Sequence, residues 1–271
     1  MHGVKLAMKG FQLEDEYFTD ALTQLDQRAL TIRSLMEQSS QEDRNELWDQ
    51  LDISSIYHDC ALEGHVLSVE ELNAAFDPTQ ITDAANFQLY TSLRNHKNAY
   101  DYVRQLAAAD DLNFDIELLN RFHEFFVSRR DDPKTIGFRQ DIPLHRLYFH
   151  EIVESGNIKN GLNSLIDSMN EPEDLETPHP VIWATYFHYH FMHIFPYNET
   201  SGKVGRAIMN LILIKYGFLP AVIHATERQR YYEILKQPQR WLTQFIIDSV
   251  NASFDAAVRF LARSTHADKK S

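Results

Sequence analysis

The segment HYHFMHIFPYNETSGKVGR, residues 188–206, holds the residues best suited to chemistry. Its small residues, 200–202, let successive backbone N–H groups point into one concavity at the start of a helix, and such a concavity binds phosphate. Lys203 and Arg206 lie one helical turn apart, so both can supply positive charge to the same anion. The carboxylate of Glu199 suits a divalent cation. The segment therefore predicts a phosphate site, and the alternative is an ordinary interhelical loop in which the glycine caps a helix.

The elements that must position this segment are helices. Only 9 glycines and 9 prolines occur in the 271 residues, too few for the turns of a β-sandwich or barrel. Apolar residues recur at helical spacing through most of the chain, which predicts a nearly all-α fold. The clearest helical patterns are YFTDALTQLDQRALTIRSLMEQ, ANFQLYTSLRNHKNAYDYVRQLAA, DIELLNRFHEFFVSRR, VIWATYFHYHFM and RAIMNLILIKY. One segment, GFRQDIPLHRLYFHEI at 137–152, has the aromatic and β-branched residues of extended chain and predicts a short β-hairpin.

Composition and charge narrow the class of protein. The net charge of −13 argues against a nucleic-acid-binding or anionic-membrane surface, because both need clustered Lys and Arg. The most apolar stretch, AIMNLILIKYGFLPAVI, is interrupted by Lys215, Gly217 and Pro220 and is shorter than the roughly 20 residues of a membrane span. No basic and apolar leader pattern opens the chain, and the single Cys60 cannot form an intramolecular disulfide. We therefore expect a soluble cytoplasmic protein.

No clear linker or internal repeat divides the chain. We expect residues 1–100 to form an N-terminal helical region that packs on a later core. The core is expected over residues 101–255, and residues 256–271 are expected to form the end of the last helix and a polar tail.

The chain from about Ile53 to about Ile247 resembles the Fic (Fido) family, whose members usually move AMP from ATP onto a hydroxyl group of a protein. The family pattern H-x-x-F-x-x-I-H-P-F-x-[D/E]-G-N-G-[R/K]-x-x-R, followed by an apolar helix with an asparagine, aligns without a gap. The matching residues are His188, Phe191, Ile194, Pro196, Tyr197 in the aromatic place, Glu199, Gly202, Lys203, Arg206 and Asn210. Further blocks occur in the family's order, among them LRNHKNAYDYV, GFRQDI and ERQRYYEIL.

The resemblance implies a Fic-type helical core with a short β-hairpin flap that docks the target, and N-terminal helices packed on that core. It implies ATP or a related nucleotide as the ligand, and Mg²⁺ held by Glu199. The residues implied to contact the phosphates are Thr200, Ser201, Gly202, Lys203 and Arg206. It also implies an unidentified target protein as a partner, and a homodimer as a state that relatives often adopt.

The site segment departs from the family pattern at three positions. In the ungapped alignment the catalytic histidine falls on Phe195, the phosphate-contacting asparagine on Ser201 and the first loop glycine on Thr200. In the family that histidine takes the proton of the attacking hydroxyl, and phenylalanine has no titratable group to do so. A shifted alignment keeps His193 as the base but inserts two residues into the loop. We favour the ungapped alignment because it alone preserves both the upstream and the downstream matches.

The spacing of His190 and His193 raises the possibility of a metal site. His190 and His193 lie three residues apart on one predicted helix and share a face. A metal site would need a carboxylate partner that the sequence does not place. We therefore favour partly buried, hydrogen-bonded imidazoles in an aromatic-rich helix.

The string DCALEG, which ends at Gly64, resembles the end of the family's inhibitory helix, here about residues 53–64. The family pattern [S/T]-x-x-x-E-[G/N] sets a glutamate against the last arginine of the site motif. The resemblance therefore implies a regulatory ion pair between Glu63 and Arg206, which competes with phosphate for the arginine. Asp59 stands in the Ser/Thr place. The alternative is that Glu63 and Gly64 only end the helix, with Gly64 as the C′ residue.

Four functions follow from these observations. The one we favour is a Fic-domain protein that binds ATP- or ADP-type phosphate through residues 199–206 but is impaired in AMP transfer, because Phe195 replaces the base. The second is phosphodiester hydrolysis, in which Glu63 orients a water and Glu199 holds Mg²⁺. The third is AMP transfer with His193 as the base. The fourth is a fold kept only as a protein-interaction scaffold.

Overall fold

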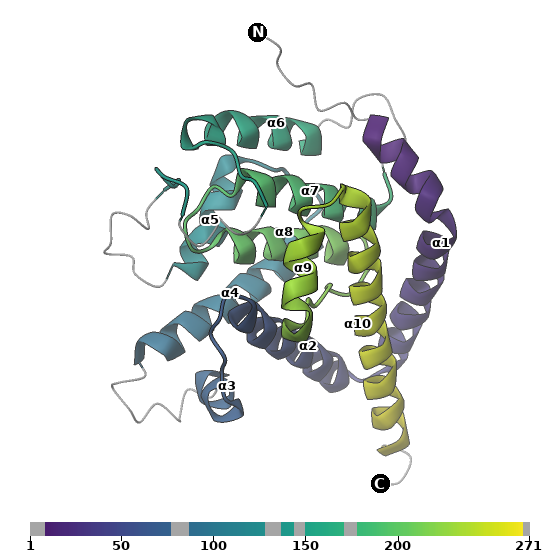
Figure 1. The fold of residues 1–271 in the computed structure, drawn as a ribbon. Helices are drawn as coiled ribbons and strands as arrows, with labels where there is room; N and C mark the ends of the chain where they lie inside the picture. The colour runs from purple at the N-terminus through teal and green to yellow at the C-terminus, as the bar shows by residue number, and fades with distance from the viewer. Residues whose placement is uncertain (1–8, 77–86, 128–136, 144–149, 171–177, 268–271) are drawn as a thin grey trace.

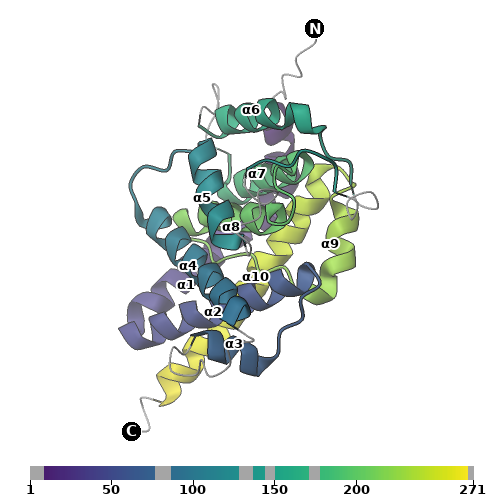
Figure 2. The same cartoon turned by 90° about the vertical axis from the view of Figure 1, so that its left-hand side faces the viewer.

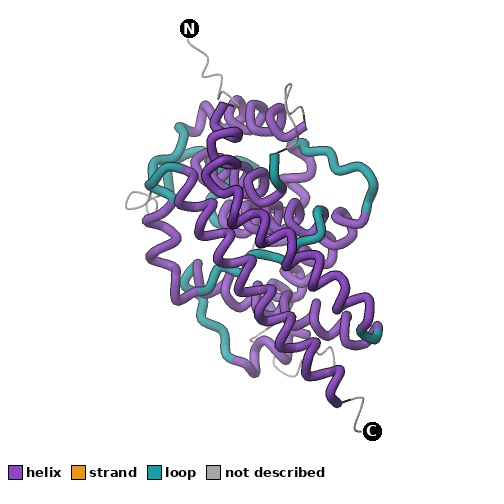
Figure 3. Tube along the Cα trace, turned by 90° about the vertical axis from the view of Figure 1, so that its right-hand side faces the viewer, coloured by secondary structure: helices purple, strands orange, loops and turns teal. Residues whose placement is uncertain are grey.

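The computed structural model describes residues 9–76, 87–127, 137–143, 150–170 and 178–267. Within these ranges the chain forms helices and loops with no β-strand, so the all-α prediction is confirmed (Figure 1, Figure 3). The α-helices are α1 (Lys9–Gln38), α2 (Gln41–Leu62), α3 (Val69–Phe76), α4 (Phe87–Ala108), α5 (Ile116–Phe126), α6 (Ile158–Asn170), α7 (Pro180–Ile194), α8 (Ser201–Lys215), α9 (Arg228–Ile234) and α10 (Gln239–Ala267). Short 3₁₀ turns, η4 (Ser155–Asn157) and η5 (Ala225–Glu227), precede α6 and α9. None of the described helices is both long and apolar enough to cross a membrane.

The segment expected to form a β-hairpin does not form strands where it is described. Residues 137–143 and 150–154 are loop, and residues 144–149 lie outside the described residues. Both described parts bond to the end of α7. The Arg139 N–H donates to the Pro196 carbonyl at 2.8 Å, and the Val153 N–H donates to the His193 carbonyl at 3.0 Å. These two backbone N–H groups therefore bond to carbonyls at the C-terminal end of α7, next to the predicted site, and not to a partner strand.

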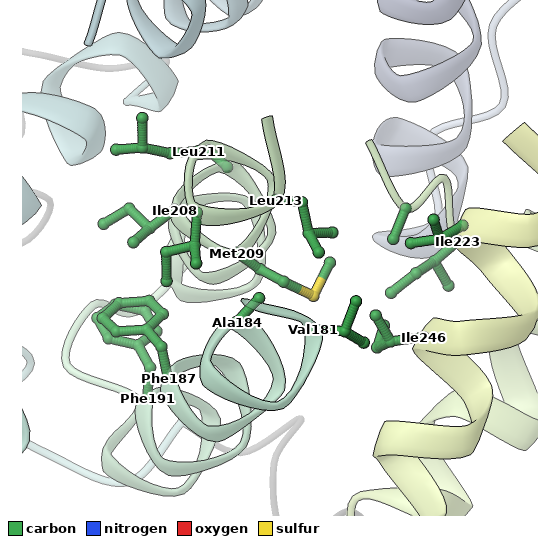
Figure 4. Close-up of a cluster of buried hydrophobic side chains, with 14 of the residues drawn as sticks. Val181, Ala184, Phe187, Phe191, Ile208, Met209, Leu211, Leu213, Ile223 and Ile246 are labelled. Carbon is green, nitrogen blue, oxygen red and sulfur yellow. The ribbon is translucent and has the colours of Figure 1, made fainter. Parts of the chain in front are cut away.

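Two central helices, α7 and α8, position the predicted site. Residues Val181, Ala184 and Phe187 of α7 lie against Ile208 and Met209 of α8, and all five are buried (Figure 4). A helix whose residues are apolar around most of its circumference is stable only when neighbouring helices cover it. Because both helices are covered, the loop between them has fixed ends.

The other helices enclose this pair. α6 and α10 pack on α7, and α4 and α5 pack on α8, while the long helices α1 and α10 run side by side along one edge (Figure 1). A single cluster of buried apolar side chains extends from Phe18 and Leu22 of α1 to Phe254 of α10. The N-terminal helices therefore share their core with the rest of the chain. The boundaries at residues 100 and 255 stay predictions.

The end of α2 is defined by local backbone geometry. Gly64 has a φ of 93°, in the left-handed region that favours glycine. The Gly64 N–H donates to the Ala61 carbonyl at 3.0 Å and the His65 N–H donates to the Cys60 carbonyl at 2.9 Å. These two bonds form a Schellman motif with Gly64 at C′. They make Glu63 the C-cap residue directly after Leu62, where its side chain can reach α8.

A smaller apolar cluster holds α2 against α3 and α4, which lie together at one end of the molecule (Figure 2). The buried members of the cluster are Ile56, Cys60, Leu67, Leu72, Tyr90, Leu93 and Tyr100. Burial of apolar surface contributes roughly 25 cal/mol per Å² removed from water. The cluster therefore stabilises α2 at its position beside α4 and α8.

His188 lies inside the contact between α7 and α8. Its side chain is wholly buried, and its Nε2 lies 2.8 Å from the Tyr231 hydroxyl. A Cβ on Gly205 of α8 would lie only 3.1 Å from His188 Nδ1, so glycine permits this close approach. Burial, with the nearby charge of Arg206, lowers the pKa of His188 to about 3. His188 is therefore neutral in the folded protein at ordinary pH.

We expect the free energy of unfolding to fall as the pH drops below about 6.5, the ordinary pKa of histidine. Between pH 6.5 and about 3 the unfolded chain binds a proton at His188 that the folded chain excludes. At pH 4 this difference amounts to about 3 kcal/mol of lost stability. Urea unfolding at pH 7 and pH 4 measures it. His188→Gln should show a shallower pH dependence than the wild type, and the exposed control His65→Gln should not; equal slopes in all three would contradict the assignment.

Candidate functional site

The site begins where α7 ends, at Phe195. Phe195 has a φ of 45°, and no other non-glycine residue among those described has a positive φ. The left-handed conformation costs an L-residue roughly 1–2 kcal/mol, and here it turns the chain out of the helix. The Phe195 side chain is 4% exposed and belongs to the main apolar core. The position aligned with the family's base therefore holds a buried phenyl ring on a tight turn.

Arg139 holds this turn in place. Its Nε donates to the Phe195 carbonyl at 2.7 Å, and its Nη2 donates to the carbonyls of Ile194, at 3.2 Å, and Val153. Its Nη1 donates to the Asp141 carbonyl at 3.3 Å. The side chain is 2% exposed, and burial lowers the pKa of Arg139. A guanidinium with five fixed donors at a helix C-terminus satisfies carbonyls that the helix leaves unbonded.

The side chains of the loop bond to one another. The Ser201 hydroxyl donates to the Tyr197 carbonyl and accepts from the Tyr197 N–H, both at 2.8 Å. Thr200 Oγ1 lies 2.6 Å from His123 Nδ1, and the His123 ring stacks on Tyr197 at 4.0 Å between centroids. The Tyr197 hydroxyl donates to Asn120 Oδ1 at 2.8 Å. The hydroxyl groups of Thr200 and Ser201 therefore stabilise the conformation of the loop. The groups that could bind an anion are the backbone N–H groups at the start of α8.

Two cations lie on the first turns of α8, beside the end of α2. Lys203 Nζ is 2.8 Å from Glu63 Oε2, and Arg206 Nη2 is 3.4 Å from Glu63 Oε1. Burial is the largest effect and disfavours the charged lysine, but the charge and hydrogen bond of Glu63, together with the other nearby acidic groups, outweigh it, so the pKa of Lys203 is raised. The carboxylate of Glu63 therefore bridges both cations, and its closer partner is Lys203.

Arg206 has a second carboxylate partner, Asp59, one turn earlier on α2. The distance from Arg206 Nε to Asp59 Oδ1 is 2.5 Å. The other oxygen of Asp59 lies 3.1 Å from both His96 Nε2 and the Tyr100 hydroxyl on α4. Burial opposes the ionised form of Asp59, but Arg206 and His96 outweigh it, so the pKa of this carboxyl lies well below its ordinary value. Asp59 is therefore ionised and pairs with Arg206.

One donor of Arg206 is left over. Its Nη1 is buried and has no hydrogen-bond partner among the described residues. A Cβ placed on Gly202 would lie 3.0 Å from this nitrogen and 3.4 Å from Glu63 Oε1. Glycine at 202 thus keeps the guanidinium next to the first turn of α8. An anion that displaced Glu63 would meet backbone N–H groups, Lys203 and the Nη groups of Arg206 together.

Comparison with known proteins shows which family and which solved structures this chain resembles. Residues 113–213 match the model of the Fic/DOC family. The chain carries a Fic domain. Protein adenylyltransferase Fic from Drosophila persimilis is 22% identical to this chain over 210 residues, and the protein of the same name from Culex quinquefasciatus is 22% identical over 213 residues. The matches cover 74% and 75% of this chain but only 39% and 41% of those proteins, so the chain spans about two fifths of their length.

Solved structures share the fold over nearly the whole chain. Fic-1 from C. elegans superposes with a TM-score of 0.73 at 18% identity, covering 92% of this chain and 74% of that one. A Fic domain containing signaling protein from Bacteroides thetaiotaomicron gives a TM-score of 0.71 at 20% identity, covering 92% and 98% of the two chains. The shared fold includes helices outside the family match, at residues before 113 and after 213.

The Fic-domain structure brings together most of the predicted site residues. Glu63, Gly202, Lys203 and Arg206 form one cluster, and Gly64 ends the helix that carries Glu63. The glycine ends the helix and the glutamate contacts both cations, and the regulatory role of this ion pair stays a prediction. Glu199 lies on the exposed side of the loop. In the described part of the chain, no group of three or more His, Cys, Asp and Glu residues is arranged to hold a metal ion.

His193 is engaged on its own helix. Its Nδ1–H donates to the Tyr189 carbonyl at 2.8 Å. Its ring lies 4.3 Å from the Tyr189 ring and 4.8 Å from the His150 ring, measured between centroids. Nearby His190 is largely buried, and burial lowers the pKa of His190 to about 4. Both histidines therefore fit hydrogen-bonded or buried imidazoles in an aromatic helix.

Arg139 and Asp59 are among the residues of this site that sequence reasoning missed. Arg139 lies in GFRQDI, the start of the segment predicted to form a β-hairpin, and a single arginine in a loop carries no local signal for carbonyl binding. Asp59 was noted only as a departure from the family pattern. Its signal was its position four residues before Glu63, which places both carboxylates on one face of a helix.

We expect Arg139→Ala to lower the free energy of unfolding by about 3 kcal/mol or more, because several buried carbonyls at the end of α7 lose their charge-assisted donor. Chemical unfolding measures the change. Arg139→Lys should recover part of it, since lysine keeps the charge but not the fork of donors. The control is Arg121→Ala, which removes an exposed arginine paired with Glu124 and should cost under about 1 kcal/mol. Equal losses for both alanine variants would contradict the role of Arg139.

Proposed function

We propose that this Fic domain binds the phosphates of ATP or a related nucleotide at the start of α8, and that it is impaired in AMP transfer. The observation that carries the proposal is the buried Arg206 guanidinium beside Gly202, with Nη1 unbonded among the described residues and Lys203 within one turn. Cations and free N–H groups at a helix N-terminus form a site for phosphate. The relatives named protein adenylyltransferase support an ATP-type ligand and a protein target.

The resting occupant of the proposed phosphate site is Glu63. Its two carboxylate oxygens contact Lys203 and Arg206, as two oxygens of a phosphate would. Its side chain is 19% exposed, and the residue is the C-cap directly after α2. Displacing it requires movement of one side chain at a helix end, and the rest of α2 stays docked. Glu63 therefore acts as a built-in competitor for the nucleotide.

Two features account for impaired transfer. Phe195 has no group that accepts a proton, and Arg139 fixes its backbone with the phenyl ring in the core. Removal of a general base typically lowers the rate about 10²- to 10⁴-fold.

Glu199 offers one exposed carboxylate, which suits Mg²⁺ because this ion binds through one or two carboxylates together with substrate phosphates. When bound, Mg²⁺ would neutralise phosphate charge. A protein partner, a homodimer and a cytoplasmic location stay predictions.

We expect ATP with Mg²⁺ to stabilise Glu63→Gly against heat, because removal of Glu63 opens the anion site. At an ATP concentration about 100 times its Kd, the shift should be roughly 5–10 °C. The wild type should shift less. Adding Lys203→Ala to Glu63→Gly should abolish the shift. The control is Lys236→Ala added to Glu63→Gly, which removes one positive charge from the segment between α9 and α10 and should leave the shift unchanged. No shift in Glu63→Gly would contradict the phosphate site and favour a scaffold.

We expect no AMP adduct when wild type or Glu63→Gly is incubated with labelled ATP and Mg²⁺, because no base lies at position 195. Intact mass and label incorporation measure this outcome. An adduct on Glu63→Gly that disappears with His193→Ala would instead establish transfer with His193 as the base. Release of AMP from a modified protein that requires Glu63 would establish the hydrolase.

A further inference from the structure

Two carboxylates from successive turns of α2 hold Arg206, and they hold it unequally. Asp59 accepts from Nε at 2.5 Å, whereas Glu63 lies 3.4 Å from Nη2. The Asp59 side chain is 7% exposed and that of Glu63 is 19% exposed. Asp59 is thus the more buried carboxylate and the one closer to Arg206. At its position the family pattern has an uncharged serine or threonine.

The surroundings of Asp59 fix it more firmly than those of Glu63. Asp59 lies inside α2, and its second oxygen contacts His96 and Tyr100 at 3.1 Å. Glu63 ends the helix and is shared with Lys203, which lies 2.8 Å away. An incoming anion can displace Glu63 by moving one side chain. To displace Asp59 it would have to break three polar contacts of a buried group, which costs more than one at a helix end.

The balance of charges at the site limits how strongly Arg206 can attract an anion. Lys203 and Arg206 face Asp59 and Glu63, so two positive charges meet two negative charges. Loss of Glu63 frees Lys203, but Arg206 keeps a carboxylate in contact at Nε. An anion beside Gly202 then interacts with a guanidinium whose charge is largely compensated, and the attraction is correspondingly weak.

We propose that Asp59 sets the anion affinity of Arg206, so that release of Glu63 alone leaves the arginine paired and only partly available to a phosphate. This inference rests on the phosphate site proposed above. Asp59 acts through Arg206 and is a positioning residue that does not itself contact the ligand. The Fic domain of this protein therefore carries two carboxylates on its phosphate-binding arginine, of which only Glu63 is easily displaced.

The test uses inorganic pyrophosphate and the isosteric variants Glu63→Gln and Asp59→Asn/Glu63→Gln. Isothermal titration should give measurable binding to Glu63→Gln and binding about tenfold tighter or more to the double variant. The matched control is Asp52→Asn/Glu63→Gln, because Asp52 is a buried carboxylate on the same helix whose partners are Arg104 and Lys97. The control should bind as Glu63→Gln does.

The outcomes separate the two proposals. Equal affinities for Glu63→Gln and the Asp59 double variant would overturn the role of Asp59 while leaving the phosphate site intact. An equal gain in the Asp52 control would also overturn it, because a general charge effect would then suffice. Absence of pyrophosphate binding in every variant would overturn the phosphate site itself and this inference with it.

A second measurement decides the matter if Asp59→Asn does not fold. The Nε–H resonance of Arg206 in ¹⁵N-labelled Glu63→Gln, assigned by its loss in Arg206→Lys, reports the bond to Asp59. We expect pyrophosphate to leave this resonance in place and protected from exchange with water. A large shift or loss of protection on binding would mean that the anion releases Nε from Asp59, and would overturn the proposal.

Discussion

A guanidinium buried among helices must have its positive charge compensated by a nearby anion. In this protein the ion pair between Asp59 of α2 and Arg206 of α8 compensates it, and the contact between the two helices depends on this pair. Arg206 is 2% exposed and keeps its charge because Asp59 lies against Nε. Asp59 is bonded in turn to His96 and Tyr100 of α4. One buried pair thereby ties three helices together. Breaking such a pair by removing one partner typically costs about 3–5 kcal/mol, so the position of α2 is coupled to the chemistry of the loop.

The two sides of the proposed phosphate site differ in rigidity. On one side, α7 and α8 pack through apolar side chains (Figure 4). Arg139 and Ser201 fix the loop between these helices. That side holds its N–H groups in place before any ligand arrives, which lowers the cost of binding. On the other side, Glu63 occupies a helix end that is partly exposed. In the proposed function, displacement of Glu63 at the end of α2 would therefore control access, and the loop between α7 and α8 would need no rearrangement.

Local patterns in the sequence predicted most of the fold. Apolar spacing indicated the long helices because each turn of a helix brings residues three and four apart onto one face. Gly64 and Gly217 mark helix ends, and both have positive φ, 93° and 87°. The extended segment at 137–152 was interpreted from residue types that favour strands, yet Arg139 and His150 at its described ends bond to carbonyls of α7. Strand propensity depends on a neighbouring strand to pair with, and no described residue supplies one there.

The sequence by itself determined the helices, the phosphate-type loop and the family resemblance, because these depend on residues close together in the chain. The tertiary structure decided which distant residues bond to the donors and charged side chains of this loop. Asp59 and Arg206 are 147 residues apart, His123 and Thr200 are 77 apart, and Arg139 and Phe195 are 56 apart. Such contacts form only after packing has excluded water from them, and burial then makes each unpaired polar group costly. Spacing along the chain does not encode that requirement, so only the folded arrangement shows that two carboxylates share Arg206.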